Sequence, residues 1–185
     1  MRHIEHMKQK RMKAEVLEEG VAYAGFFELR RLTLQHDRYA GGTTGPLVRE
    51  VLHRSDVVAA LLYDPVVDKF VLVEQFRVGA HAAGIDPWLI DIVAGRIEKG
   101  QTPIDAVMRE IFEETGLVPT TIEAIGGFMT APHLSSERAY LYYATVNASD
   151  VAGLHGVAHE GEDSSTNHAC QTVHAPRGAP GNYPE

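Results

Sequence analysis

Acidic side chains gather in one short stretch, "REIFEETG", which begins at Arg109. Residues three or four apart are neighbours on a helix, so Glu110, Glu113 and Glu114 would form one patch beside the Arg109 cation. Such clustered acids are found on solvated helix faces, where they repel each other weakly. They also suit a hard cation such as Mg²⁺ or Mn²⁺, which in turn carries phosphates. The spacing alone does not decide between these two interpretations.

The helix that carries these acids has clear ends. Thr102 can cap it, Pro103 suits its first turn, and Asp105 completes a capping-box pattern. Gly116 supplies a left-handed stop, so the pattern predicts a helix from about Pro103 to Thr115. Its apolar stripe, which should face a sheet, consists of Ile104, Val107, Met108 and Ile111.

Strands are predicted on both sides of this helix. Three apolar segments precede it, "VVAALLYD", "KFVLVEQF" and "WLIDIV", and two follow it, "TIEAIGGFMT" and "AYLYYATV". Further upstream, "YAGFFELRRLTLQHD" and the turn "AGGTTGP" indicate a small antiparallel sheet. A sheet of that size is unstable alone, so it must pack on the main domain or on a partner chain. The fold class is α+β, with a mixed sheet flanked by helices.

Composition narrows the possible partners. A chain of 185 residues with a net charge of -8 is one acidic domain with an accessory element, and its charge argues against nucleic acid. The longest apolar run, Val57 to Tyr63, is too short to cross a membrane, and the N-terminus lacks a signal peptide's apolar core. Cys170 is the only cysteine, which fits a reducing compartment, so we expect a cytoplasmic protein.

Both ends of the sequence differ from its middle. The first dozen residues are polar and basic, and we interpret them as a frayed leader. Beyond Val157 the chain lacks Leu, Ile, Phe and Met, which predicts loop or disorder. The expected organisation is a leader and dimer-forming sheet (1–52), a main domain (53–163) and an atypical tail (164–185).

The long motif around the acids resembles the Nudix box, Gx5Ex7REUxEExGU, where U is aliphatic. Gly95, the run Arg109 to Glu114, Gly116 and Leu117 match it. Gln101 is the one departure, because the family has Glu there. The resemblance implies a magnesium-dependent hydrolase that cleaves a nucleoside diphosphate linked to another group, and an α/β/α fold.

Other segments are similar to the ADP-ribose pyrophosphatase branch, namely "YAGFFELRRLTL", "LVREVLHRSDVVAALLYDPVVDKFVLVEQFRVGA", "PWLIDIVAGRIEKG" and "SSERAYLYYA". Members of that branch are homodimers that share their N-terminal sheets. The similarity implies Mg²⁺ as cofactor, with Mn²⁺ possible, and hydrolysis of ADP-ribose to AMP and ribose 5-phosphate. The alternatives are hydrolysis of another nucleotide sugar and binding of a nucleotide without cleavage.

The resemblance also assigns roles to single residues. The metal ligands would be the Ala94 carbonyl, Glu110, Glu113, Glu114 and Glu162, with Glu160 in the loop "GLHGVAHEGED" as the catalytic base. Arg109 would orient the glutamates. The implied substrate contacts are Arg77 at phosphate, Phe26, Phe27, Arg49 and Glu50 at adenine, and Arg54 and Glu137 elsewhere.

Two departures from the family pattern lead to further expectations. Gln101 has an amide in place of a carboxylate, so we expect weakened activity that Gln101→Glu raises. The family continues past the acidic loop with an apolar strand and a helix, whereas this sequence reads "SSTNHACQTVHAPRGAPGNYPE". We interpret this tail as a frameshifted or truncated end from which the strand and helix are missing; the alternative is a natural short tail.

Overall fold

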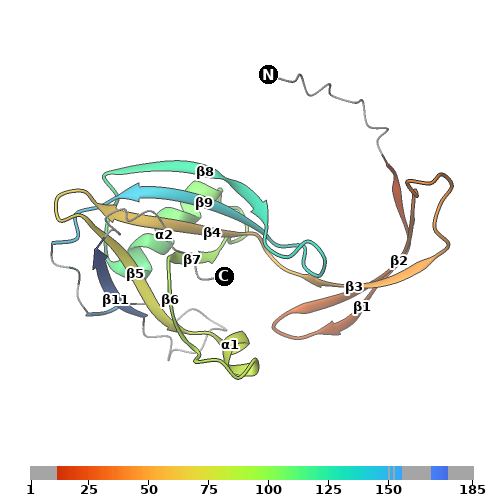
Figure 1. Ribbon diagram of the computed structural model, residues 1–185, viewed down its shortest axis with the longest axis horizontal. Helices are drawn as coiled ribbons and strands as arrows, with labels where there is room; N and C mark the ends of the chain where they lie inside the picture. Colours follow the sequence, from red (N-terminus) through yellow and green to blue (C-terminus); the bar gives the residue numbers. More distant parts are fainter. Residues whose placement is uncertain (1–11, 150, 152, 156–167, 175–185) are drawn as a thin grey trace, which may run out of the picture. The chain divides into compact units, whose positions relative to one another are not determined.

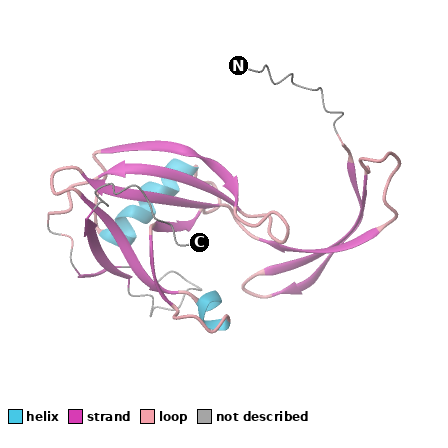
Figure 2. Ribbon diagram, in the orientation of Figure 1, coloured by secondary structure: helices cyan, strands magenta, loops and turns pink. Residues whose placement is uncertain are grey.

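The structure is a computed structural model that describes residues 12–149, 151, 153–155 and 168–174. It contains two compact units, which we describe separately. The first unit comprises residues 1–54 with the loop 131–136, and the second comprises residues 55–130 and 137–185. Figure 1 labels the strands and helices, and Figure 2 colours them by type.

The first unit is a three-stranded antiparallel sheet with the strand order β1-β2-β3. Its strands are β1 (Ala14–Ala24), β2 (Glu28–His36) and β3 (Leu47–His53). The loop 131–136 joins its edge, since the Leu52 amide donates to the Leu134 carbonyl at 2.8 Å. Every residue of β1 is exposed. The small sheet predicted from the sequence therefore exists, and none of the described residues of its unit covers β1.

The second unit is built on an eight-stranded mixed sheet. The order β10-β11-β5-β4-β9-β8 forms its main path, with β6 added to β5 and β7 added to β4. These strands are β4 (Val57–Asp64), β5 (Lys69–Phe76), β6 (Trp88–Asp91), β7 (Val93–Arg96), β8 (Thr121–Met129), β9 (Arg138–Thr145), β10 (Gly153–His155) and β11 (His168–His174). The helices are α1 (Val78–Ala82) and α2 (Pro103–Thr115).

Strands β4 and β5 pair only near their shared hairpin and then separate. They are hydrogen-bonded at Leu62–Asp64, after which β7 pairs with β4 at Val57–Ala60 and β6 pairs with β5 at Val73–Phe76. The segment "WLIDIV" thus contains β6 and the first residue of β7, and these two short strands lie where β4 and β5 part. This arrangement puts the backbone of Ala94 and Gly95 in the sheet next to α2.

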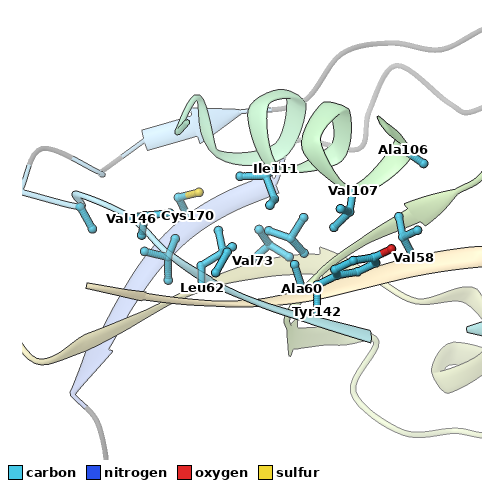
Figure 3. Close-up of a cluster of buried hydrophobic side chains, with 14 residues drawn as sticks. Val58, Ala60, Leu62, Val73, Ala106, Val107, Ile111, Tyr142, Val146 and Cys170 are labelled. Atoms are coloured by element: carbon cyan, nitrogen blue, oxygen red, sulfur yellow. The ribbon is translucent and has the colours of Figure 1, made fainter. Parts of the chain in front are cut away.

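Helix α2 packs against this sheet through its apolar side. Ala106, Val107 and Ile111 are fully buried against Val58, Ala60 and Leu62 of β4 and against Val73 of β5. Figure 3 shows these side chains between the helix and the strands, with Tyr142 and Cys170 at the sides of the cluster. Apolar burial of this kind is the main force that holds a helix on a sheet.

Two elements differ from the sequence-based expectation. Helix α1 was not predicted, because five residues are too few to show a helical period. Strand β11 lies where the sequence predicts loop, yet it pairs with β5 from Ala169↔Glu74 to His174↔Lys69 and buries Cys170 in the core. In the part of the chain that the structure describes, no helix follows α2, and none is long and apolar enough to cross a membrane.

Candidate active site

Helix α2 begins and ends at the residues that the sequence indicates. The Thr102 hydroxyl accepts a hydrogen bond from the Asp105 amide, and the Asp105 carboxylate accepts one from the Thr102 amide, which completes a capping box. Gly116 has a φ of 71°, the left-handed conformation that glycine adopts without strain. These caps fix which side chains face the sheet.

Two of the three glutamates on α2 are buried. Glu110 is 8% exposed and Glu114 is 5% exposed, so they do not belong to a solvated face. A Cβ placed on Gly95 would lie 1.8 Å from Oε1 of Glu110, which means that only glycine leaves room for this carboxylate. The backbone amide of Ala94 donates to Oε2 of Glu114 at 3.2 Å. Both carboxylates therefore lie against the backbone of strand β7.

Burial makes the charge on Glu114 costly. Removal from water, together with the nearby Glu110 carboxylate, raises the pKa of Glu114 to about 8. The Ala94 amide and the Arg77 cation oppose this shift, while Asp91 adds to it. A bound cation would offset the repulsion between these two buried carboxylates. The pair is therefore suited to a metal site.

Arg109 links these acids to the strand below. Its Nη2 donates to Oε1 of Glu110 at 2.8 Å and to the Arg96 carbonyl at 2.9 Å, and its Nη1 donates to Oε2 of Glu113 at 2.7 Å. These contacts suit an orienting residue, a role that stays a prediction. Glu113 is engaged by Arg109 here, so its predicted part in metal ligation would require that contact to change.

The donor set fits a hard divalent cation. Glu110 and Glu114 supply carboxylate oxygens, the ligand type that Mg²⁺ and Mn²⁺ prefer. Among the described residues no group of three or more His, Cys, Asp or Glu side chains is arranged to hold a metal ion, so these two glutamates are the only carboxylates of the predicted ligand set that the structure brings together. The predicted ligand Glu162 and the predicted base Glu160 lie outside the described residues. Ligation by the Ala94 carbonyl also stays a prediction.

Gln101 contacts Glu98 at the turn before α2. Its Oε1 accepts a hydrogen bond from the Glu98 amide at 3.1 Å, and its Nε2 lies 3.5 Å from Oε2 of Glu98. The backbone amide of Gln101 also donates to the Glu98 carbonyl at 3.1 Å. The amide that replaces the family's carboxylate is thus used to close a local turn.

Arg77 has a partner that the sequence reasoning missed. Its Nε and Nη2 lie 2.8 Å and 2.7 Å from Oδ2 of Asp91, and both charges act on Glu114. A charged residue in the otherwise apolar segment "WLIDIV" was the available signal. Glu137, another predicted substrate contact, is 8% exposed and accepts a hydrogen bond from the Thr130 hydroxyl at 3.0 Å.

The remaining predicted substrate contacts belong to the first unit. The rings of Phe26 and Phe27 meet edge to face with centroids 4.8 Å apart, and the Arg54 guanidinium lies 4.7 Å from the centre of the Phe27 ring. Arg49 donates to the Val48 carbonyl at 2.8 Å, and Glu50 lies 3.4 Å from Nη2 of Arg31. The structure brings Phe26, Phe27 and Arg54 together, with both rings exposed and Arg54 partly buried.

The fold and the acidic helix agree with comparisons to known proteins. A family model for the NUDIX domain matches residues 53–181. A solved structure described as an ADP compounds hydrolase has a TM-score of 0.59 at 17% identity, covering 87% of this chain and 77% of its own. The chain therefore belongs to the Nudix family.

Curated relatives narrow the position within the family. An ADP-ribose pyrophosphatase of Haemophilus influenzae is 36% identical over 166 residues, which are 88% of this chain and 76% of the relative. An ADP-ribose pyrophosphatase of Escherichia coli (strain K12) is 35% identical over 149 residues, which are 80% of this chain and 71% of the relative. The resemblance to the ADP-ribose pyrophosphatase branch is thereby confirmed.

Proposed function

We propose that this protein hydrolyses the diphosphate of ADP-ribose to AMP and ribose 5-phosphate, with Mg²⁺ as its cation. The observation that carries the proposal is the buried pair Glu110 and Glu114, held against the backbone of β7. A buried acid with a raised pKa, such as Glu114, is costly to the fold and is characteristic of functional sites. The names of the relatives supply the substrate.

Each residue of the site has a separate role in the proposed reaction. Glu110 and Glu114 would hold the cation, which supplies positive charge at the diphosphate oxygens and acidifies a bound water. Arg109 keeps Glu110 in place through its contact of 2.8 Å. Arg77 would bind a phosphate through its guanidinium. In the proposal Glu160 takes the proton from the attacking water, and Glu113 and Glu162 assist with the cation.

Recognition of adenine is assigned to the first unit. Phe26 and Phe27 offer ring faces and edges for stacking, and Arg54 lies over the Phe27 ring. Arg49 and Glu50 on β3 would supply edge hydrogen bonds, and Glu137 is proposed as a further contact to the substrate. We include homodimer formation through the first unit and a cytoplasmic location, which the single, buried Cys170 fits.

A panel of substrates tests the proposed activity. Purified protein is incubated with Mg²⁺ and with ADP-ribose, other nucleotide sugars or diadenosine phosphates, while AMP release is followed. We expect AMP and ribose 5-phosphate from ADP-ribose. Glu114→Gln should lower kcat by about 10²- to 10³-fold, a loss similar to removal of one essential electrostatic group in other enzymes. Glu123→Gln on the exposed face of β8 makes the same change in charge and should retain activity.

The alternatives appear as different outcomes of the same panel. Faster cleavage of another nucleotide sugar would replace ADP-ribose as the substrate while keeping the site. Binding of ADP-ribose with no cleavage of any compound would reduce the protein to a nucleotide-binding domain. A wild-type rate of ADP-ribose cleavage in Glu114→Gln would contradict the assignment of the site itself.

A further inference from the structure

Asp91 occupies the last position of β6, next to the site. In the register of β5 and β6, Asp91 lies opposite Val73 and Leu89 lies opposite Gln75. Residues directly opposite each other on paired strands point to the same face, so Asp91 shares the face of Val73 and Gln75. Both of these are buried on the side that packs against α2. Asp91 is only partly buried there, and its carboxylate is held by an ion-pair partner.

The partner is Arg77, which follows β5. Its backbone is held at both ends, since its amide donates to the Pro87 carbonyl at 2.8 Å and its carbonyl accepts from the His81 amide at 3.1 Å. Its Nε and Nη2 both reach Oδ2 of Asp91, at 2.8 Å and 2.7 Å. Two contacts from one planar guanidinium to one carboxylate set the orientation of the plane.

This contact leaves most of the guanidinium available. An arginine side chain has five N–H donors, of which the one on Nε donates to Asp91 and one on Nη2 is taken up by the ion pair. Within the described part of the chain the guanidinium has no further partner, so three donors, including both on Nη1, stay available to a ligand. The side chains of Arg77 and Asp91 are 40% and 39% exposed, and ion pairs that exposed contribute little to folding stability. The consequence of the pair is therefore orientation more than stability.

The pair also lies within electrostatic range of the acids on α2. The Arg77 cation lowers the pKa of Glu114 and the Asp91 anion raises it, so both charges are felt at that carboxylate. A diphosphate bound at Glu110 and Glu114 through a cation would come within reach of a guanidinium placed there. The orientation of the Arg77 guanidinium would then affect how the site binds the diphosphate.

We propose that Asp91 is the positioning residue that turns the guanidinium of Arg77 toward the diphosphate of the substrate. This inference rests on the proposed function and adds a residue to its site. Asp91 does not touch the substrate and acts only through Arg77. Its loss should weaken substrate binding and leave the chemical step nearly intact, because Arg77 would still be present with its plane no longer fixed.

Steady-state kinetics with ADP-ribose and Mg²⁺ test the proposal. We expect Asp91→Asn to raise KM about tenfold with kcat changed less than about threefold, and Asp91→Glu to recover most of the affinity. In an Arg77→Ala background, Asp91→Asn should have no further effect, because a residue that acts through Arg77 has nothing left to position. Asp86→Asn, in the loop before β6, is the matched control for charge and should leave KM unchanged.

Two kinetic outcomes would overturn the proposal. Equal losses from Asp91→Asn with and without Arg77 would show that Asp91 acts independently of the arginine. A fall in kcat together with a higher requirement for Mg²⁺ would make Asp91 a part of the metal site. A lowered Tm that accompanies the loss in both backgrounds would assign Asp91 a purely structural role.

A measurement without turnover separates this inference from the proposed function. In ¹H–¹⁵N spectra, the Nε–H signal of Arg77, identified by its absence in Arg77→Lys, should be shifted and slow to exchange because it is bonded to a carboxylate. Asp91→Asn should move it toward the position of solvated arginines. An unmoved signal would overturn the contact, whereas failure of the wild type to bind or cleave ADP-ribose would overturn the proposed function instead.

Discussion

The two units of this protein differ in how far their apolar side chains are buried. In the first, every residue of β1 is exposed, and Val21 and Tyr23 are 58% and 63% exposed. In the second, Val58, Val73 and Ile111 are fully buried between α2 and the sheet. The second unit is thus stable enough to enclose two repelling carboxylates. The first unit has strands and ladder hydrogen bonds but little core of its own.

The difference shows where each unit obtains its stability. A buried core is close-packed and does not relax easily, so it can hold Glu110 and Glu114 in one geometry. An exposed three-stranded sheet needs cover from elsewhere, and an unpaired apolar surface is characteristic of a protein interface. Substitutions in the second unit should therefore act mainly on activity, and substitutions in the first unit should act mainly on association between subunits.

The largest effect is expected in the second unit, at Gly95. Gly95→Ala places a methyl group 1.8 Å from the present position of Glu110 Oε1, so the carboxylate must leave its place. We expect kcat/KM for ADP-ribose to fall at least about 100-fold, because small misplacements of catalytic groups carry costs of that order. Gly45→Ala, where an added Cβ meets nothing within 4 Å, is the control in the first unit. Retention of more than half the activity by Gly95→Ala would contradict this geometry.

The next effect should appear in assembly, and it concerns the first unit. Val21→Lys puts a charge on the exposed apolar surface of β1, and in a homodimer formed through this surface it should weaken association about tenfold or more. Sedimentation velocity over a dilution series measures the change. Val66→Lys introduces the same charge at a residue of the second unit that is 90% exposed, and it should leave association unaltered. A wild-type protein that is monomeric at every concentration would refute the dimer.

A smaller effect is expected at Asp64, which stabilises the second unit from within. Its Oδ2 accepts a hydrogen bond from the Ala148 amide at 2.6 Å, and its Oδ1 accepts from Val66 at 2.8 Å. The Ala148 bond is the main reason that the pKa of Asp64 lies below its ordinary value, and the amides of Val66 and Val67 add to the lowering. Asp64→Asn would turn an amide N–H toward the Ala148 N–H and should lower Tm by roughly 5 °C at pH 7.

The pH dependence of this effect follows from the direction of the shift. Because the pKa of Asp64 is lowered by folding, its charge stabilises the fold above the unfolded pKa of about 4. That contribution is lost as the pH falls through the lower, folded pKa. The Tm values of wild type and Asp64→Asn should therefore converge below about pH 4. A constant difference down to pH 3 would show that the charge is not responsible.

Local signals explain how much of the structure the sequence could predict. The bounds of α2 were predictable because capping residues, a proline and a glycine act within a few positions of themselves. Strands β4 and β5 were predictable because their apolar runs are short and rich in β-branched residues. The acidic motif identified α2 as the helix of the site because its residues also lie within a few positions of one another.

Non-local pairing explains what could not be predicted. The pattern in "HACQTVH" is too polar to indicate a strand, and β11 exists because β5 offers an open edge to it. The contact of Asp91 with Arg77 joins the last residue of β6 to the residue that follows β5, and no spacing in the sequence specifies it. The burial of Glu110 and Glu114 likewise depends on β7, whose approach follows from the separation of β4 and β5.

The smallest effect is expected at Gln101, where the structure refines the expectation from the sequence. The Gln101 side chain closes a turn with Glu98, so Gln101→Glu would keep the acceptor for the Glu98 amide but set two carboxylates against each other. The added negative charge favours a cation at the site, while the repulsion loosens the turn, and these consequences partly cancel. We expect kcat to rise by no more than about threefold across a Mg²⁺ titration. If the rise is small because of Glu98, then Glu98→Gln combined with Gln101→Glu should restore the turn and exceed the single variant. A tenfold rise from Gln101→Glu alone would mean that position 101 acts directly on the cation.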